Sequence, residues 1–143
     1  MKGPRLRVPM VAAWATALVL SFAAGLPAMA VSPFADVTVQ QAQALIQQGA
    51  GQKDFVVLDV RTPQEFAGGH LAGALNINFL ASDFAAHANA LDRGKTYLVY
   101  CHSGNRSVRA VQAMVQLRFR SVYNMLGGII AWESKDFPLS RTP

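Results

Sequence analysis

The sequence predicts an α/β domain with a largely parallel central sheet. Short apolar segments rich in β-branched residues alternate with segments of helical spacing, and breaks containing Gly, Pro or Asp separate them. In addition, 52% of the 143 residues are apolar and only 15% are charged, which is typical of one compact globular domain.

The first elements carry clear boundary signals. Thr38 is a suitable N-cap for a helix over 38–48, which the glycines at 49 and 51 would end. The continuous apolar run 55–60 is typical of a strand buried on both faces. After it, Thr62, Pro63 and Glu65 form the pattern of a capping box, so a short helix is expected to begin there and to end at Gly68 and Gly69.

The later elements follow the same alternation. We expect a short strand around 74–77, a helix over 80–91, a strand over 96–101, a helix over 107–117, a strand over 121–126 and a short helix over 127–134. The segment 96–101 is the clearest strand, and 107–117 repeats apolar residues at a helical spacing that leaves one broad buried face. Strands separated by such helices imply right-handed crossovers, with helices covering both faces of the sheet.

Residues 1–30 have the layout of a secretory signal peptide. Three cations in the first seven residues precede an uncharged apolar run from Val8 to Leu26, and the small residues Ala28 and Ala30 form a cleavage site of the A-x-A type. We therefore expect cleavage after Ala30, export to the periplasm, and a single domain over 31–143. The alternative is a retained membrane anchor, because the apolar run approaches the length of a spanning helix.

The net charge of +5 does not indicate nucleic-acid binding. Removal of the segment 1–30 also removes its three cations, which leaves ten cations against eight anions. Because no basic patch remains, we expect no nucleic-acid partner and no stable membrane association after cleavage.

The chain has one cysteine, Cys101, so it cannot form an internal disulfide. A free thiol is exposed to oxidation in an oxidising compartment, which calls for a reason for its presence. Cys101 lies where the clearest strand meets the clearest helix, and ligands of open α/β sheets bind at such turns. The small residues that follow it would let backbone N–H groups point inward and form an anion site, which lowers the pKa of a cysteine held over it. The alternative, a cysteine that only packs at the end of a strand, is disfavoured by Gly104 and Arg106 at this spacing.

Three segments resemble the single-domain rhodaneses, which are sulfurtransferases. They are VVLDVRTPQEFAGGHLAGALNIN (56–78), YLVYCHSGNRS (97–107) and VYNMLGGIIAW (122–132). The resemblance implies a five-stranded parallel sheet and an active-site loop that runs from Cys101 to Arg106. It also implies a ping-pong reaction, in which Cys101 takes the outer sulfur of a donor such as thiosulfate as a persulfide and passes it to a thiol or to cyanide.

The site residues expected on this basis fall into two groups. Cys101 is the nucleophile, and the loop that would bind the anionic donor consists of His102, Ser103, Gly104, Asn105 and Arg106. In the resembled family, Asp59 and Arg61 help to support this loop; the alternative is an ion pair at a strand end with no role in the chemistry. No cofactor or metal is expected, because a thiolate is already a nucleophile and the three histidines are scattered.

The sequence departs from the family at two positions. Arg118 precedes Phe119 where the family usually has a glycine, and a left-handed backbone there would cost about 1 kcal/mol. His102 follows the cysteine where thiosulfate-preferring loops commonly carry Arg or Lys, which leaves the identity of the donor open.

Two alternative functions differ from thiosulfate sulfurtransfer. One is a persulfide carrier that a partner protein loads. The other is a cysteine phosphatase, whose loops have five residues between Cys and Arg; the four found here would make a smaller cradle.

Overall fold

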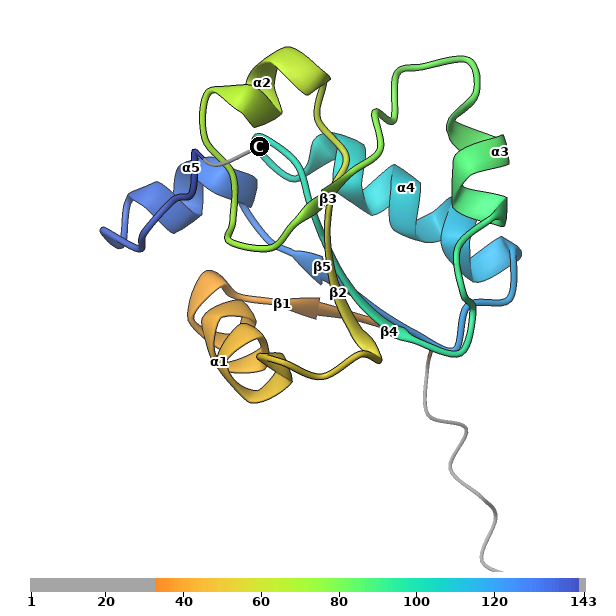
Figure 1. Ribbon diagram of the computed structural model, residues 1–143, viewed down its shortest axis with the longest axis horizontal. Coiled ribbons are helices and arrows are strands. Elements are labelled where there is room, and N and C mark those ends of the chain that lie inside the picture. Colours follow the sequence, from red (N-terminus) through yellow and green to blue (C-terminus); the bar gives the residue numbers. More distant parts are fainter. Residues whose placement is uncertain (1–32, 142–143) are drawn as a thin grey trace, which may run out of the picture. The chain divides into compact units, whose positions relative to one another are not determined.

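The computed structural model describes residues 33–141, which form an α/β domain around one five-stranded sheet (Figure 1). The strands lie in the order β1-β5-β4-β2-β3, and every neighbouring pair is parallel, which confirms the predicted fold class. In chain order, the elements are β1 (Phe34–Val37), α1 (Val39–Gly49), β2 (Phe55–Asp59), α2 (Pro63–Ala67), β3 (Leu75–Asn76), α3 (Phe84–Asn89), β4 (Thr96–Tyr100), α4 (Asn105–Gln116), β5 (Ser121–Met125) and α5 (Gly128–Glu133).

Helices cover both faces of the sheet, as expected (Figure 1). On one face, α1 and α5 contribute Ala42 and Trp132 to a core that includes Leu98 of β4. On the other face, α3 and α4 pack over the next residue of the same strand, Val99, with Met114 fully buried there. The strand side chains therefore alternate between two apolar layers, as the continuous apolar runs predict.

The sequence pattern misses one strand, β1. Its four residues include Ala35 and Asp36, which are uncommon in strands, and both are exposed. It lies at the edge of the sheet, where Val37 pairs with Met125 of β5. A short, half-exposed edge strand gives no apolar run, so only the family resemblance implied a fifth strand.

Hydrogen bonds at the helix ends explain where the elements begin. Thr62 Oγ1 accepts from the backbone N–H of Glu65 at 3.2 Å, and the Glu65 carboxylate accepts from the N–H of Thr62 at 3.0 Å, which confirms the predicted capping box. Thr38 caps α1 in the same way. α3 is shorter than predicted because turns occupy the segment from Leu80, which is 64% exposed, to Asp83. α4 begins at Asn105, two residues before the predicted start.

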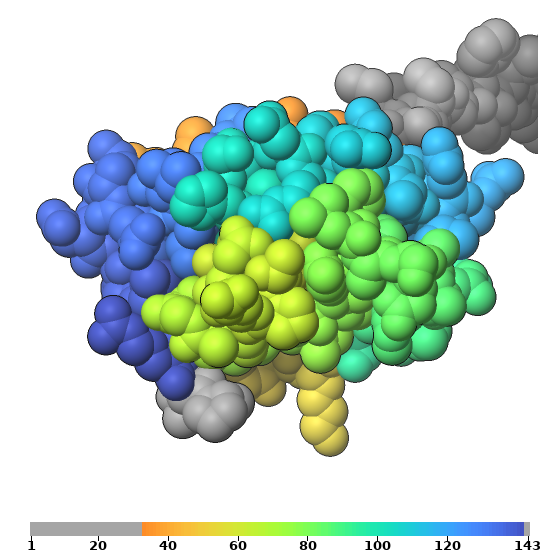
Figure 2. Space-filling model, turned by 90° about the horizontal axis from the view of Figure 1, so that it is seen from above, coloured from red at the N-terminus to blue at the C-terminus, as the bar shows by residue number. Residues whose placement is uncertain are grey.

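The strands place the candidate site at one edge of the sheet. β2, β4 and β5 end at Asp59, Tyr100 and Met125, so the residues that follow them gather at the carboxyl edge. Figure 2 looks onto this edge and shows α2 (yellow-green), the β4–α4 loop (teal) and the α5 segment (blue) near one another. The predicted signal segment, 1–30, lies outside the described residues. Between residues 33 and 141, no helix has the length and apolar character needed to cross a membrane.

Candidate active site

Cys101 lies immediately after β4, at the start of the loop that leads into α4. The loop contains four residues between Cys101 and Arg106, and α4 begins within it. The cysteine is 1% exposed and is a free thiol. The strand therefore fixes the sulfur at the amino end of a twelve-residue helix, where the helix dipole favours negative charge.

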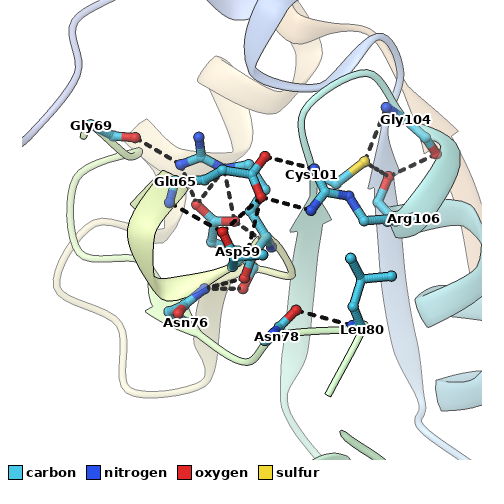
Figure 3. Close-up of polar contacts among 12 residues, drawn as sticks. Asp59, Glu65, Gly69, Asn76, Asn78, Leu80, Cys101, Gly104 and Arg106 are labelled. Carbon is cyan, nitrogen blue, oxygen red and sulfur yellow. Dashed lines mark hydrogen bonds and ion pairs between the residues drawn. The ribbon is translucent and has the colours of Figure 1, made fainter. Parts of the chain in front are cut away.

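Hydrogen-bond donors surround the sulfur. The backbone N–H of Gly104 donates to Cys101 Sγ at 3.1 Å, and Figure 3 shows the sulfur directed toward Gly104. Burial raises the pKa of the Cys101 thiol, but hydrogen bonds from the Ser107 hydroxyl and from the N–H groups of Ser107, Gly104 and Arg106 lower it. The net result is a pKa below the ordinary cysteine value, which favours the thiolate.

Ser107 is a site residue that the sequence analysis does not identify. Its side chain is fully buried, with the Oγ 3.5 Å from Cys101 Sγ and donating to the carbonyl oxygen of Gly104 at 3.1 Å. In the thiol form, the sulfur donates to this hydroxyl; after ionisation, the hydroxyl proton can turn toward the sulfur instead. The sequence analysis predicts that the helix begins at 107, so Ser107 is considered there only as its first residue. A serine close in sequence to a reactive cysteine is a signal that could have identified it as a site residue.

Two glycines give the loop its shape. Gly104 has a φ of 102°, a left-handed conformation that a glycine adopts without steric cost. Gly128, at the start of α5, lies against the other side of the loop: a Cβ there would be 2.6 Å from the carbonyl oxygen of Cys101 and closer still to that of His102. The N–H of Ile129 donates to the Cys101 carbonyl at 2.9 Å. The β5–α5 turn therefore supports the loop from behind.

Arg106 is held by Glu65 of α2, a contact that the sequence does not reveal. Two guanidinium nitrogens donate to the two carboxylate oxygens at 2.7 and 2.8 Å (Figure 3). The hydrogen bond from Arg106 is the main cause that lowers the pKa of Glu65 from 4.5 to about 2. Because the two residues are 41 positions apart, only the packing of α2 beside the loop brings them together.

Asp59 and Arg61 form a buried ion pair beside the loop. Arg61 Nη2 donates to the Asp59 carboxylate at 2.7 Å and also to the carbonyl oxygen of Gly69 at 2.7 Å. The guanidinium lies 5.7 Å from the centre of the Tyr100 ring. Within residues 33–141, the hydrogen bonds of this pair hold the segment after α2 and do not reach residues 101–106, while the charge of Asp59 helps to raise the pKa of Arg106.

The remaining loop residues face outward. His102, Ser103 and Asn105 are exposed, and within the described part of the chain the hydrogen bonds of the sulfur are to Gly104, Ser107 and the backbone N–H of Arg106. A pocket of about 270 Å³ opens between α2, the loop and α5. It is lined by Arg61, Glu65, Gly68, Gly69, His102, Ile129, Glu133 and Leu139.

No group of three or more potential metal ligands occurs between residues 33 and 141. The residues gathered at the loop are one thiol, two carboxylates, two guanidinium groups and the exposed His102. This set can hold a small anion over a nucleophilic sulfur.

Comparison with known proteins assigns this arrangement to a family. The family described as the rhodanese-like domain matches residues 38–135. The chain belongs to the rhodanese-like domain family. The resemblance found in the sequence is therefore confirmed, and the rhodanese fold accounts for the five-stranded parallel sheet.

Several relatives of this rhodanese are sulfurtransferases by name. The chain is 37% identical over 105 residues to thiosulfate sulfurtransferase GlpE of Pseudomonas entomophila, covering 73% of this chain and 89% of that protein. It is 34% identical to rhodanese-like domain-containing protein 17 of Arabidopsis thaliana, covering 72% of this chain and 70% of the relative. A solved structure of a rhodanese-related protein from Thermoplasma volcanium matches with a TM-score of 0.62 and 31% identity, covering 75% of this chain and 98% of that one. The family and the similarity to GlpE support sulfurtransferase activity.

Proposed function

We propose that this rhodanese is a thiosulfate sulfurtransferase that carries sulfur as a persulfide on Cys101. The observation that supports this most directly is the buried sulfur at the amino end of α4, with the N–H of Gly104 donating to it at 3.1 Å. The lowered pKa of the thiol provides a nucleophile without a separate general base.

The reaction has two half-reactions. The Cys101 thiolate attacks the outer sulfur of thiosulfate, the S–S bond of the donor breaks, and its electron pair leaves with sulfite. In the second half-reaction, a thiol or cyanide attacks the outer sulfur of the persulfide, and the bonding pair returns to Cys101 as the thiolate.

Residues 101–107 provide the electrostatic support for both steps. The N–H groups that lower the pKa of the thiol are fixed in the loop, so they also stabilise the negative charge of the persulfide without reorganisation. The loop residues His102, Ser103 and Asn105 line its exposed side, where the donor would approach. Asp59 and Arg61 would support the segment beside it.

The biological setting is also part of the proposal. A signal peptide over 1–30 would be cleaved after Ala30 and place the domain 31–143 in the periplasm, where small sulfur anions, thiols or cyanide would be its partners. The chemistry described needs no metal or cofactor, because the sulfur itself changes partners in each step.

Intact mass spectrometry tests the proposal. The purified protein is incubated with thiosulfate, small molecules are removed, and its intact mass is measured. The variant Cys101→Ser is treated in the same way as a control. We expect the wild-type chain to gain the mass of one sulfur atom, to lose it on addition of cyanide, and the variant to gain nothing. If a folded protein with a titratable thiol gains no sulfur, thiosulfate is not its donor, and loading by a partner protein becomes the better hypothesis.

A further inference from the structure

We propose that Glu65 sets the charge preference of the site for its sulfur donor, so that singly charged donors are favoured relative to doubly charged thiosulfate. The inference rests on the proposed function and deepens it. It assigns to Glu65 a role in specificity beyond capping α2.

The geometry leaves little of the Arg106 charge for a donor. Each terminal guanidinium nitrogen of Arg106 donates to one Glu65 oxygen, at 2.7 and 2.8 Å, and such a bidentate pair is a strong arrangement for an arginine and a carboxylate. The side chains are 20% and 32% exposed, so the pair lies at the edge of the site and not in bulk solvent. Glu65 is further fixed by Thr62, whose N–H and hydroxyl both donate to it at 3.0 Å.

The other charged side chains around the loop and the pocket do not give the site a net positive charge. Arg61 is paired with Asp59, and Glu133 adds a carboxylate to the pocket that Glu65 also lines. Arg109, the next cation along α4, lies 5.2 Å from the ring centre of Phe79. Around the loop and the pocket, the three carboxylates of Asp59, Glu65 and Glu133 outnumber the two guanidinium groups of Arg61 and Arg106, even before the Cys101 thiolate is counted.

A donor anion is therefore held mainly by backbone dipoles. Fixed N–H groups can bind one negative charge of a donor well. A second negative charge on the donor is repelled by the Cys101 thiolate, and within the described residues of the loop and the pocket no unpaired cation offsets this repulsion. Thiosulfate carries two charges. Methanethiosulfonate has the same transferable sulfur and one charge, because a methyl group replaces one charged oxygen.

The test compares the two donors in Glu65→Gln. Glutamine can still accept at the capping position, so α2 should persist, but it no longer neutralises Arg106. We expect the ratio of kcat/KM for thiosulfate to kcat/KM for methanethiosulfonate to rise about tenfold, since one additional charge pair near a protein surface is worth this order of magnitude. Taking the ratio cancels any change in the reactivity of Cys101, which affects both donors.

Two control variants separate this role from others. Glu133→Gln removes an exposed carboxylate from the same pocket without releasing Arg106. Because solvent screens the charge of Glu133, the ratio should stay within about twofold of the wild-type ratio. In the double variant Glu65→Gln with Arg106→Gln, the gain should disappear, because the released cation is then absent.

A measurement on the wild-type protein does not depend on the folding of any variant. If Glu65 neutralises the Arg106 charge, raising the ionic strength should increase kcat/KM for thiosulfate relative to kcat/KM for methanethiosulfonate, because salt screens the greater repulsion that the doubly charged donor meets. A much steeper loss for thiosulfate would contradict the inference.

The outcomes separate the inference from the function on which it rests. If both donors are used and the ratio in Glu65→Gln is unchanged or falls, Glu65 only positions Arg106 and the inference is wrong. If the wild-type protein uses neither donor, the proposed function is wrong and the inference fails with it.

Discussion

Replacement of Gly128 by alanine should destabilise the protein more than the addition of a single methyl group suggests. The residue has a φ of +59°, which costs an L-amino acid roughly 1–2 kcal/mol. The added Cβ would also overlap the backbone carbonyls of His102 and Cys101, and these atoms cannot rotate away. Overpacking of this kind adds about 1–3 kcal/mol, so we expect a total loss of about 3 kcal/mol.

Gly73 provides a matched control for the steric contribution to this loss of stability. Gly73 has a φ of +71°, close to that of Gly128, but nothing lies within 4 Å of a Cβ built on it. Gly73→Ala should therefore cost only the backbone term, about 1 kcal/mol. The difference between the two variants isolates the contact between the β5–α5 turn and the loop.

Equilibrium unfolding in urea, followed by circular dichroism, measures both free energies. Persulfide loading measured by mass spectrometry on the same samples reports on the loop, and Gly128→Ala should load more slowly than Gly73→Ala. Equal free energies of unfolding for the two variants would refute the reasoning, because the close approach of Gly128 to the loop would then carry no energetic cost.

Two further predictions concern single side chains. Arg118, which has a φ of 68°, should be replaceable by glycine with a gain of about 1 kcal/mol in the free energy of unfolding, measured by urea denaturation; a loss would mean that its side chain makes a stabilising contact. Ser107→Ala should raise the pKa of the Cys101 thiol, because it removes a hydrogen bond that lowers it, and alkylation by iodoacetamide near neutral pH should slow by roughly tenfold, as one hydrogen bond to a charged group predicts. A pH profile of alkylation identical to that of the wild-type protein would exclude this role for Ser107.

The parts of the fold that the sequence reveals are those set by local signals. Thr62 and Glu65 lie three residues apart and form the capping box that their spacing predicts. Cys101 follows the clearest predicted strand, so its place at the carboxyl edge follows from the alternation of strands and helices. Arg118 stands where the family usually has a glycine, and its backbone is left-handed with a φ of 68°, so the cost that the sequence analysis attached to such a conformation applies.

The parts that the sequence hides depend on tertiary packing. The Glu65 carboxylate accepts hydrogen bonds from both Thr62 and Arg106. The capping-box pattern with Thr62 predicts the first of these contacts but not the second. The approach of Gly128 to the loop depends on how β5 and β4 pair, with Val99 opposite Asn124. β1 gives no signal because an exposed edge strand needs no apolar run.

The structure separates two tasks that a positively charged loop would combine. A free arginine beside the sulfur would lower the pKa of the thiol and attract any anion, so reactivity and donor charge would rise together. Here the hydrogen bonds that lower the thiol pKa come from uncharged donors, Ser107 and the backbone N–H groups, while Arg106 forms its hydrogen-bonded ion pair with Glu65. Substitutions at the two positions should therefore have separable effects: Ser107→Ala should change the pH dependence for every donor alike, and Glu65→Gln should change which donor is preferred.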